Sequence, residues 1–227
     1  MIIKPPEPEH IPQLRSLWKQ AFGDTDAFLD KFFSAGFAPE RCRCVIDRGQ
    51  VAAALYWFNC QCGGQPLAYI YAVATGKAFR GQGLCRRLMA HAEKDLKARG
   101  FACCVLTPGE PGLYAYYENL GYRTAFARRR TPFPGGKSIS LEEYMLRREK
   151  LLQEPHMIYD KTVLSYAASV YGLTFYETDR GVAAASPCYT AEVLPEDLEG
   201  ERVSCGMIRQ LAGHASETLG YLGFALE

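Results

Sequence analysis

A short glycine-rich stretch, Phe79–Cys85, carries the residue types best suited to hold an anion. It follows an apolar run that predicts a strand, Ala68–Thr75, and leads into an amphipathic run that predicts a helix, Gly83–Arg99. A strand that turns through glycines into a helix directs free backbone N–H groups, and the positive end of the helix, at one point. Glycine lets a phosphate approach the backbone, and Arg80 adds a fixed positive charge. The stretch therefore predicts a pyrophosphate site.

Two common phosphate-binding motifs do not match this part of the chain. A P-loop needs Ser or Thr directly after Gly-Lys, but the stretch Gly76–Ala78 ends in alanine. A dinucleotide-binding fold needs a third glycine where Gly81–Arg86 ends in arginine. A tight turn that simply starts a helix is the alternative that the glycine pattern alone leaves open.

The stretch Arg80–Leu84 resembles the acetyl-CoA loop of the GNAT N-acetyltransferase superfamily, whose pattern is Arg/Gln-x-x-Gly-x-Gly/Ala. Downstream, Tyr116–Tyr122 is similar to that family's Tyr-Glu-x-Leu-Gly-Phe/Tyr signature, with a helix and a strand between the two motifs, as in the family. The resemblance covers Met1–Phe126. The loop departs from the pattern at Cys85, where the family has Gly or Ala.

The resemblance implies an α/β GNAT fold: a mixed central sheet with splayed parallel strands, flanked by helices and here extended by a smaller C-terminal α+β region. In that fold the pantetheine arm of the coenzyme enters between the splayed strands, like an added strand. The resemblance gives it the backbone of Val73, Ala74 and Thr75. It gives the diphosphate the loop residues, which are Arg80, Gly81, Gln82, Gly83, Leu84, Cys85 and Arg86.

The second motif supplies the candidate catalytic residue. Tyr117 aligns with the family's tyrosine that faces the coenzyme sulfur, and a phenol with a pKa of about 10 can protonate a departing thiolate at neutral pH. The alternative is that Tyr117 belongs to the core and that Tyr114 or Tyr116 faces the sulfur. The general base stays open among Glu110, Glu118 and an ordered water.

Composition argues against several other classes of protein. The chain has 227 residues and a net charge of +1, which gives no reason to expect nucleic acid or an anionic membrane as a partner. No apolar run approaches the length of a membrane span, and the N-terminus lacks the apolar core of a signal peptide, so we expect a cytoplasmic protein. The nine cysteines include no Cys-x-x-Cys pair, and the histidines are scattered. We therefore expect reduced thiols, without a metal site.

The elements before the glycine loop must form its platform. Helical spacing predicts a helix over Glu7–Phe22, and Asp24 or Thr25 can cap a short second helix that is rich in phenylalanine. These aromatic residues belong either to the core or to the acceptor pocket. The runs Arg41–Ile46 and Val51–Asn59 predict a hairpin.

The amino-acid composition of the chain changes from Ala127 onward. We expect the basic run Arg128–Arg130 to lie on a solvated strand edge and a connector to follow it. Two helices are expected next, the first beginning with a capping box at Ser140 and reaching Gln153, the second spanning Asp160–Tyr171. The last residues, Leu219–Leu226, predict a closing strand.

A weak internal repeat suggests how this second part arose. Residues Thr178–Ala185 resemble Ile46–Ala54, and two helices precede the hairpin in both places, although a chance match is the alternative. We infer a GNAT acetyl-CoA-binding catalytic domain over 1–128 and a degenerate GNAT-like region over 129–227. The second part lacks its own Arg-x-x-Gly-x-Gly loop.

The favoured function is a CoA-dependent N-acetyltransferase. It would use acetyl-CoA as co-substrate and move the acetyl group directly to the amine of a small molecule or peptide in a ternary complex. The alternatives are a non-catalytic module that senses acyl-CoA and a transferase of another acyl group. The acceptor and the oligomeric state stay open, and a homodimer is one candidate for the latter.

Overall fold

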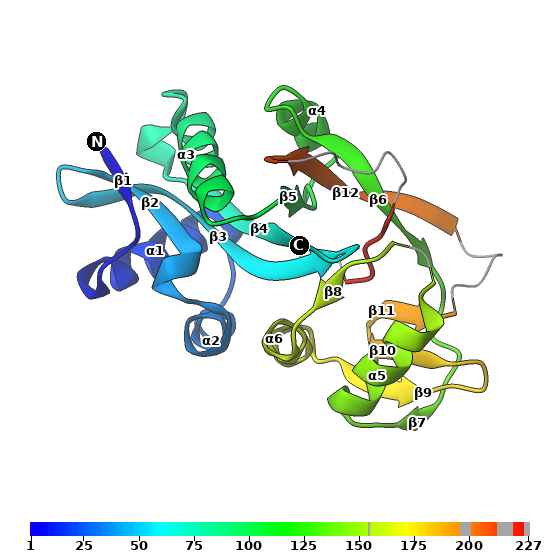
Figure 1. Ribbon diagram of the computed structural model, residues 1–227. Helices are drawn as coiled ribbons and strands as arrows, with labels where there is room; N and C mark the ends of the chain where they lie inside the picture. The colour runs from blue at the N-terminus through cyan, green and yellow to red at the C-terminus, as the bar shows by residue number, and fades with distance from the viewer. Residues whose placement is uncertain (154, 196–200, 213–219, 225–227) are drawn as a thin grey trace.

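The computed structural model describes residues 1–153, 155–195, 201–212 and 220–224. Figure 1 shows a large sheet with helices on both faces and a smaller sheet below it. The α-helices are α1 Ile11–Phe22, α2 Asp26–Lys31, α3 Leu84–Ala98, α4 Gly112–Glu118, α5 Leu141–Leu151 and α6 Lys161–Tyr171. A π-helical turn, Phe32–Gly36, extends α2.

The large sheet contains both parallel and antiparallel pairs, as expected for the fold. Its strands run in the order β1-β2-β3-β4-β5-β12-β6-β13, and β8 pairs with β3. Their bounds are β1 Ile2–Lys4, β2 Cys42–Asp47, β3 Gln50–Cys62, β4 Gln65–Thr75, β5 Cys103–Leu106, β6 Arg123–Arg130, β8 Ile158–Tyr159, β12 Glu201–Gln210 and β13 Gly220–Tyr221. Strands β4 and β5 are parallel, which confirms the expected parallel pair at the centre.

The parallel strands β4 and β5 separate along their length. Their register runs only from Leu67 opposite Cys103 to Tyr69 opposite Val105. Beyond Tyr69, β4 continues to Thr75 without β5 beside it, while it stays paired with β3 on its other edge. The predicted splay is therefore present, and it leaves one backbone edge of β4 open toward the site.

Two hydrophobic clusters cover the two faces of this sheet. The first holds Trp18 of α1 and Tyr166 of α6, together with inward residues of β2, β3 and β4. The second holds Leu88 and Leu96 of α3, together with Tyr117 of α4. Because side chains alternate across a strand, successive residues of β4 enter different clusters, and the sheet separates the α1 side from the α3 side.

Strand β12 comes from the C-terminal part of the chain but lies in the middle of the large sheet. It is antiparallel to β5 on one side and to β6 on the other. The chain therefore leaves the large sheet after β6, returns to it briefly at β8, which pairs with β3, and returns again as β12. The predicted division at residues 128 and 129 stays a prediction, and the strands on either side of it share one sheet.

The smaller sheet has the order β11-β10-β9-β7. Its strands are β7 Lys137–Ser138, β9 Thr174–Glu177, β10 Val182–Ser186 and β11 Tyr189–Leu194. Ser140 caps α5 by accepting from the Glu143 amide, and Asp160 caps α6 by accepting from the Val163 amide. Both helices begin where the sequence predicts, so these caps confirm the local prediction.

Two predictions for the second part need correction. Arg128 does not lie on a solvated edge, because β6 extends to Arg130 and pairs with β12; the Arg128 side chain is buried and donates to the Tyr189 hydroxyl. The predicted closing strand is short: β13 covers Gly220–Tyr221. Residues 222–224 are not in a strand, although the Leu222 amide still donates to the Ala127 carbonyl of β6 at 3.2 Å. The rest of that prediction falls on residues 219 and 225–226, outside the described part.

The cysteines are all free thiols, and six of the nine are buried. The six buried thiols act as small apolar residues within the two clusters, in line with the expected reduced state. Across the described ranges of the chain, no helix combines the length and the apolar character needed to cross a bilayer.

Candidate active site

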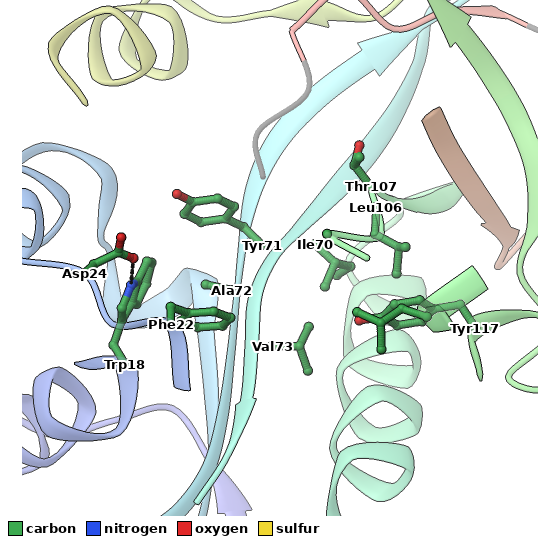
Figure 2. Close-up of a pocket in the computed structure, with 12 residues that line it drawn as sticks. Trp18, Phe22, Asp24, Ile70, Tyr71, Ala72, Val73, Leu106, Thr107 and Tyr117 are labelled. Atoms are coloured by element: carbon green, nitrogen blue, oxygen red, sulfur yellow. Dashed lines mark hydrogen bonds between the residues drawn. The ribbon is translucent and has the colours of Figure 1, made fainter. Parts of the chain in front are cut away.

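A cavity of about 260 Å³ lies where β4 and β5 separate. Its lining comes from both sides of the sheet: Trp18 and Tyr71 belong to the cluster on the α1 side, while Leu106 and Tyr117 belong to the cluster on the α3 side. Figure 2 shows these two groups on opposite sides of β4. The lining residues are Trp18, Phe22, Asp24, Ile70, Tyr71, Ala72, Val73, Leu106, Thr107, Gly109, Leu113 and Tyr117. The cavity therefore reaches both faces of the sheet.

A β-bulge distorts β4 at the centre of this cavity. Tyr71 pairs with Tyr56 and Ala74 pairs with Ala54, so one residue of β3 stands opposite two residues of β4. Ala72 takes a φ of 49°, which is unusual for a residue with a side chain. Bulges re-aim strand residues and interrupt the regular ladder. Here the bulge turns the backbone at Ala72 and Val73 toward the splay.

Three tyrosines of α4 are candidates for the residue that faces the coenzyme sulfur, and their side chains lie in different surroundings. Tyr117 lines the cavity and is buried, and burial raises the pKa of its phenol above the usual value. The Tyr114 hydroxyl instead donates to the backbone carbonyl of Ser204, at 3.3 Å. Tyr116 does not line the cavity, and its ring packs edge-on against Tyr117. In Figure 2 the Tyr117 hydroxyl points toward Val73, across the cavity.

The glycine loop has the geometry of an anion cradle. Gly81 and Gly83 have φ values of 75° and 69°, which only glycine adopts readily, and a Cβ at either would meet no atom within 4 Å. Among the described residues, no backbone carbonyl accepts from the amides of residues 81–86. The space in front of the loop is open and its donors are unused. The loop therefore fits a diphosphate at the start of α3.

The remaining predicted coenzyme residues connect this loop to the cavity. Val73 lines the cavity, whereas Ala74 and Thr75 pair with β3 through one edge and face the splay with the other. The Arg80 side chain is exposed, and its Nε donates to the Thr75 carbonyl at 3.3 Å. Arg80 therefore stands at the end of β4, beside the open amides.

The α1 side of the cavity contains a residue that the sequence analysis assigned differently. Thr25, not Asp24, caps α2, accepting from the Phe28 amide at 3.2 Å. The Asp24 carboxylate instead accepts from the Trp18 indole at 2.7 Å and lines the cavity. A carboxylate between two helices is typical of a helix cap, so nothing in the sequence pattern pointed separately to a cavity role for Asp24. The aromatic residues beside it, Trp18 and Phe22, serve both core and cavity.

Several other residues weighed from the sequence lie away from the cavity. Glu110 and Glu118, the side-chain candidates for the general base, are exposed and do not line it. Tyr56 is buried in the core and Phe33 packs beside Phe37, so neither borders the cavity.

A group of possible metal ligands, Glu7, Glu9 and His10, lies at the start of α1. There the His10 Nδ1 already accepts from the Glu7 amide at 2.9 Å. This contact helps to cap the 3₁₀ turn that leads into the helix.

Comparisons with known proteins identify the family and the fold of this chain. A family model for the acetyltransferase (GNAT) domain matches residues 2–125. The fold is similar to that of a GCN5-related N-acetyltransferase from Kribbella flavida, with a TM-score of 0.70 and 15% identity over 92% of this chain and 72% of that one. A GCN5-related N-acetyltransferase from Anabaena variabilis gives a TM-score of 0.62 and 14% identity, over 93% of this chain and 73% of that one.

A third similar structure is longer. Eis1 from Mycobacterium abscessus gives a TM-score of 0.61 and 14% identity, over 81% of this chain and 53% of its own. No curated protein matches the sequence. At these identities the structural likeness concerns the fold, while the family match rests on the first 125 residues.

Proposed function

The chain belongs to the GNAT acetyltransferase family, and on that premise we propose that it moves an acetyl group from acetyl-CoA to an amine in a ternary complex. The observation that carries the proposal is the cavity at the splay of β4 and β5. It joins a buried phenol, Tyr117, to an open β4 edge that leads directly to the unused amides of the glycine loop.

The loop supplies binding energy far from the reacting atoms. Amides of residues 81–86 and the N-terminus of α3 would hold the diphosphate, with Arg80 as a positive charge beside it. The open edge at Val73, Ala74 and Thr75 would hydrogen-bond the pantetheine arm. Binding energy gained there fixes the thioester in the cavity, where the reaction needs accurate placement.

The residues around the splay can promote both halves of acyl transfer. Backbone N–H groups at the bulge, near Val73 and Ala74, would polarise the thioester carbonyl. As the amine nitrogen bonds to the carbonyl carbon and the carbon–sulfur bond breaks, the Tyr117 phenol would donate its proton to the departing sulfur. The nitrogen would release a proton to water, and a proton from water would restore the Tyr117 phenol. Its raised pKa keeps the proton on the phenol until the thiolate forms.

The proposal is tested by following thiol release from acetyl-CoA with a panel of primary amines, alongside calorimetric titration of acetyl-CoA. We expect heat of binding, and thiol release that depends on the amine. Heat without release from any amine would favour a non-catalytic acyl-CoA sensor. No heat with any CoA thioester at high protein concentration would reject coenzyme binding altogether.

The same assay tests whether the protein transfers an acyl group other than acetyl. Propionyl-CoA and longer thioesters are compared with acetyl-CoA, with one amine held constant. The Ile70 and Leu106 side chains border the cavity on the α3 side, and we propose that they restrict the acyl chain to a short one. We expect acetyl-CoA to give the highest kcat/KM, and faster transfer of a longer chain would contradict this.

A further inference from the structure

The two ends of the cavity differ in chemistry. On the α3 side, Tyr117 faces Val73 among apolar side chains, and this is the end where acyl transfer is proposed. On the α1 side the lining consists of Trp18, Phe22, Asp24 and Tyr71. Figure 2 shows Asp24 and Tyr117 on opposite sides of β4. A group held at Asp24 is therefore not the group that reacts beside Tyr117.

Asp24 is prepared to bind a cation. Its Oδ2 accepts from the indole Nε1 of Trp18, whose ring is only 2% exposed and packs against Phe32 and Tyr56. That contact fixes the carboxylate. Among the described residues, no hydrogen bond or ion pair is recorded for its second oxygen, Oδ1. Figure 2 shows the carboxylate on the same side of β4 as the Tyr71 ring.

The surroundings of Asp24 favour a single positive charge next to an apolar chain. Of the twelve lining residues, all of them described, Asp24 alone is charged. The faces of Trp18 and Tyr71 suit both methylene groups and a cation, because an aromatic ring attracts positive charge. A carboxylate on the acceptor would meet no positive side chain in the lining, and a polycation would meet only one negative group.

Helix α6, from the second part of the chain, packs behind this end of the cavity and contacts its lining residue Tyr71. The Tyr166 hydroxyl lies 3.1 Å from the Tyr71 hydroxyl, within hydrogen-bonding distance. Burial first, and the Asp24 charge as a smaller contribution, raise the pKa of both Tyr71 and Tyr166. The carboxylate is therefore close enough to influence both hydroxyls, which fits one polar subsite.

We propose that the acceptor is a diamine with an apolar spacer, one nitrogen of which stays charged at the Asp24 carboxylate while the other reacts near Tyr117. This inference rests on the proposed function, because it names the acceptor class of that site. The proposal follows from the positions of Asp24 and Tyr117 at opposite ends of the cavity. The reacting nitrogen must be uncharged to attack, so the charge that Asp24 recognises belongs to a second group on the same molecule.

The test compares three probes of similar length: diaminopentane, pentylamine and aminopentanoate. Each is titrated calorimetrically into the wild-type protein, with and without CoA. We expect the diamine to bind at least about tenfold more tightly than pentylamine, because hydrogen bonds between charged groups are worth that much. Aminopentanoate should bind more weakly still. Equal affinities for the diamine and the monoamine, or no diamine binding, would overturn the proposal.

Two variants identify the residue responsible. Asp24→Asn keeps an oxygen for the Trp18 indole, so the fold should persist, and it should abolish the preference for the diamine. Asp26→Asn is the matched control, because Asp26 is exposed, pairs with Lys19 and lies outside the cavity lining. A diamine preference that survives in Asp24→Asn would reject the assignment.

A separate titration with acetyl-CoA distinguishes this inference from the proposed function. Diamine binding that depends on Asp24, in a protein that gives no heat with acetyl-CoA, would leave the subsite standing and reject the transferase. Heat with acetyl-CoA, but no preference among the three probes, would reject the diamine subsite and leave the proposed transferase standing.

Discussion

The hydroxyl groups of Tyr71 and Tyr166 lie 3.1 Å apart and share a hydrogen bond. Tyr71 stands on β4 at the cavity, whereas Tyr166 stands on α6, in the segment between β6 and β12. That segment therefore reaches the wall of the candidate active site. Besides extending the large sheet, this segment helps to fix the Tyr71 ring, which borders the acceptor end of the cavity.

Replacing Tyr117 with phenylalanine should lower kcat by about a hundredfold, the lower end of what general acid catalysis contributes. The Kd for acetyl-CoA should stay unchanged, because the proposed role concerns the leaving sulfur. Tyr114→Phe is the matched control on the same helix, since its hydroxyl contacts the β12 backbone instead. Steady-state kinetics and calorimetry give both quantities. Equal turnover in the two variants would refute the assignment.

The pH dependence of turnover offers an independent check on Tyr117. Burial raises the pKa of this phenol above its ordinary value of about 10, so it stays protonated throughout the neutral and mildly alkaline range. We expect kcat to show no loss attributable to Tyr117 between about pH 7 and 10. The profile is measured for the wild type and for Tyr117→Phe. An alkaline decline below pH 10 that disappears in the variant would contradict this prediction.

Replacing Gly83 with alanine should weaken acetyl-CoA binding by about tenfold, because a left-handed backbone costs a residue with a Cβ about 1–2 kcal/mol. The loop would relax away from its φ of 69°, and its amides would no longer converge. Gly100→Ala is the control: Gly100 has a φ of 87°, also meets no atom within 4 Å, and ends α3 far from the loop. Both variants should lose some thermal stability. If both also bind acetyl-CoA equally well, the loop is not the coenzyme site.

Glu93 should make stability depend on pH. Its side chain is buried in α3, accepts from the Tyr122 hydroxyl at 3.1 Å and pairs with Arg209 at 3.1 Å. Burial raises its pKa above the value in the unfolded chain, and the two partners offset part of that shift. Because the folded state then holds a proton more strongly, the contribution of Glu93 to stability falls as pH rises between the two pKa values.

The measurement is the free energy of unfolding in urea at pH 4 and pH 7, for the wild type and Glu93→Gln. The stability of the wild type relative to this variant should be greater at pH 4 than at pH 7. Glu118→Gln, which changes an exposed carboxylate on the neighbouring helix, should show no such trend. If the stability of the wild type relative to Glu93→Gln instead grew with pH, the ion pair with Arg209 would outweigh the effect of burial on the Glu93 pKa.

Local patterns in the sequence were sufficient for the elements around the loop. Glycines at positions 81 and 83, the apolar run of β4 and the stripe of leucines in α3 each act over a few residues, so their structure follows from nearby chemistry. The caps at Ser140 and Asp160 are local in the same sense. The order of strand, loop and helix could therefore be predicted.

Contacts between distant segments could not be predicted from such local patterns. The pairing of β12 joins residues about a hundred positions apart with β5 and about 70 to 85 apart with β6. Hydrophobic alternation does not say which strand a segment will join. The burial of Arg128 follows from that pairing, so it was missed too. Asp24 was missed because a residue suited to capping a helix has the same type as one suited to binding a cation.

The position of β12 also constrains how the protein folds during synthesis. Strands β5 and β6 cannot acquire their shared neighbour until residues 201–210 have been synthesised. Until then one edge of each strand stays unpaired, and sheet closure is a late event of high contact order. The protein should consequently depend on holdase chaperones until β12 has joined the sheet.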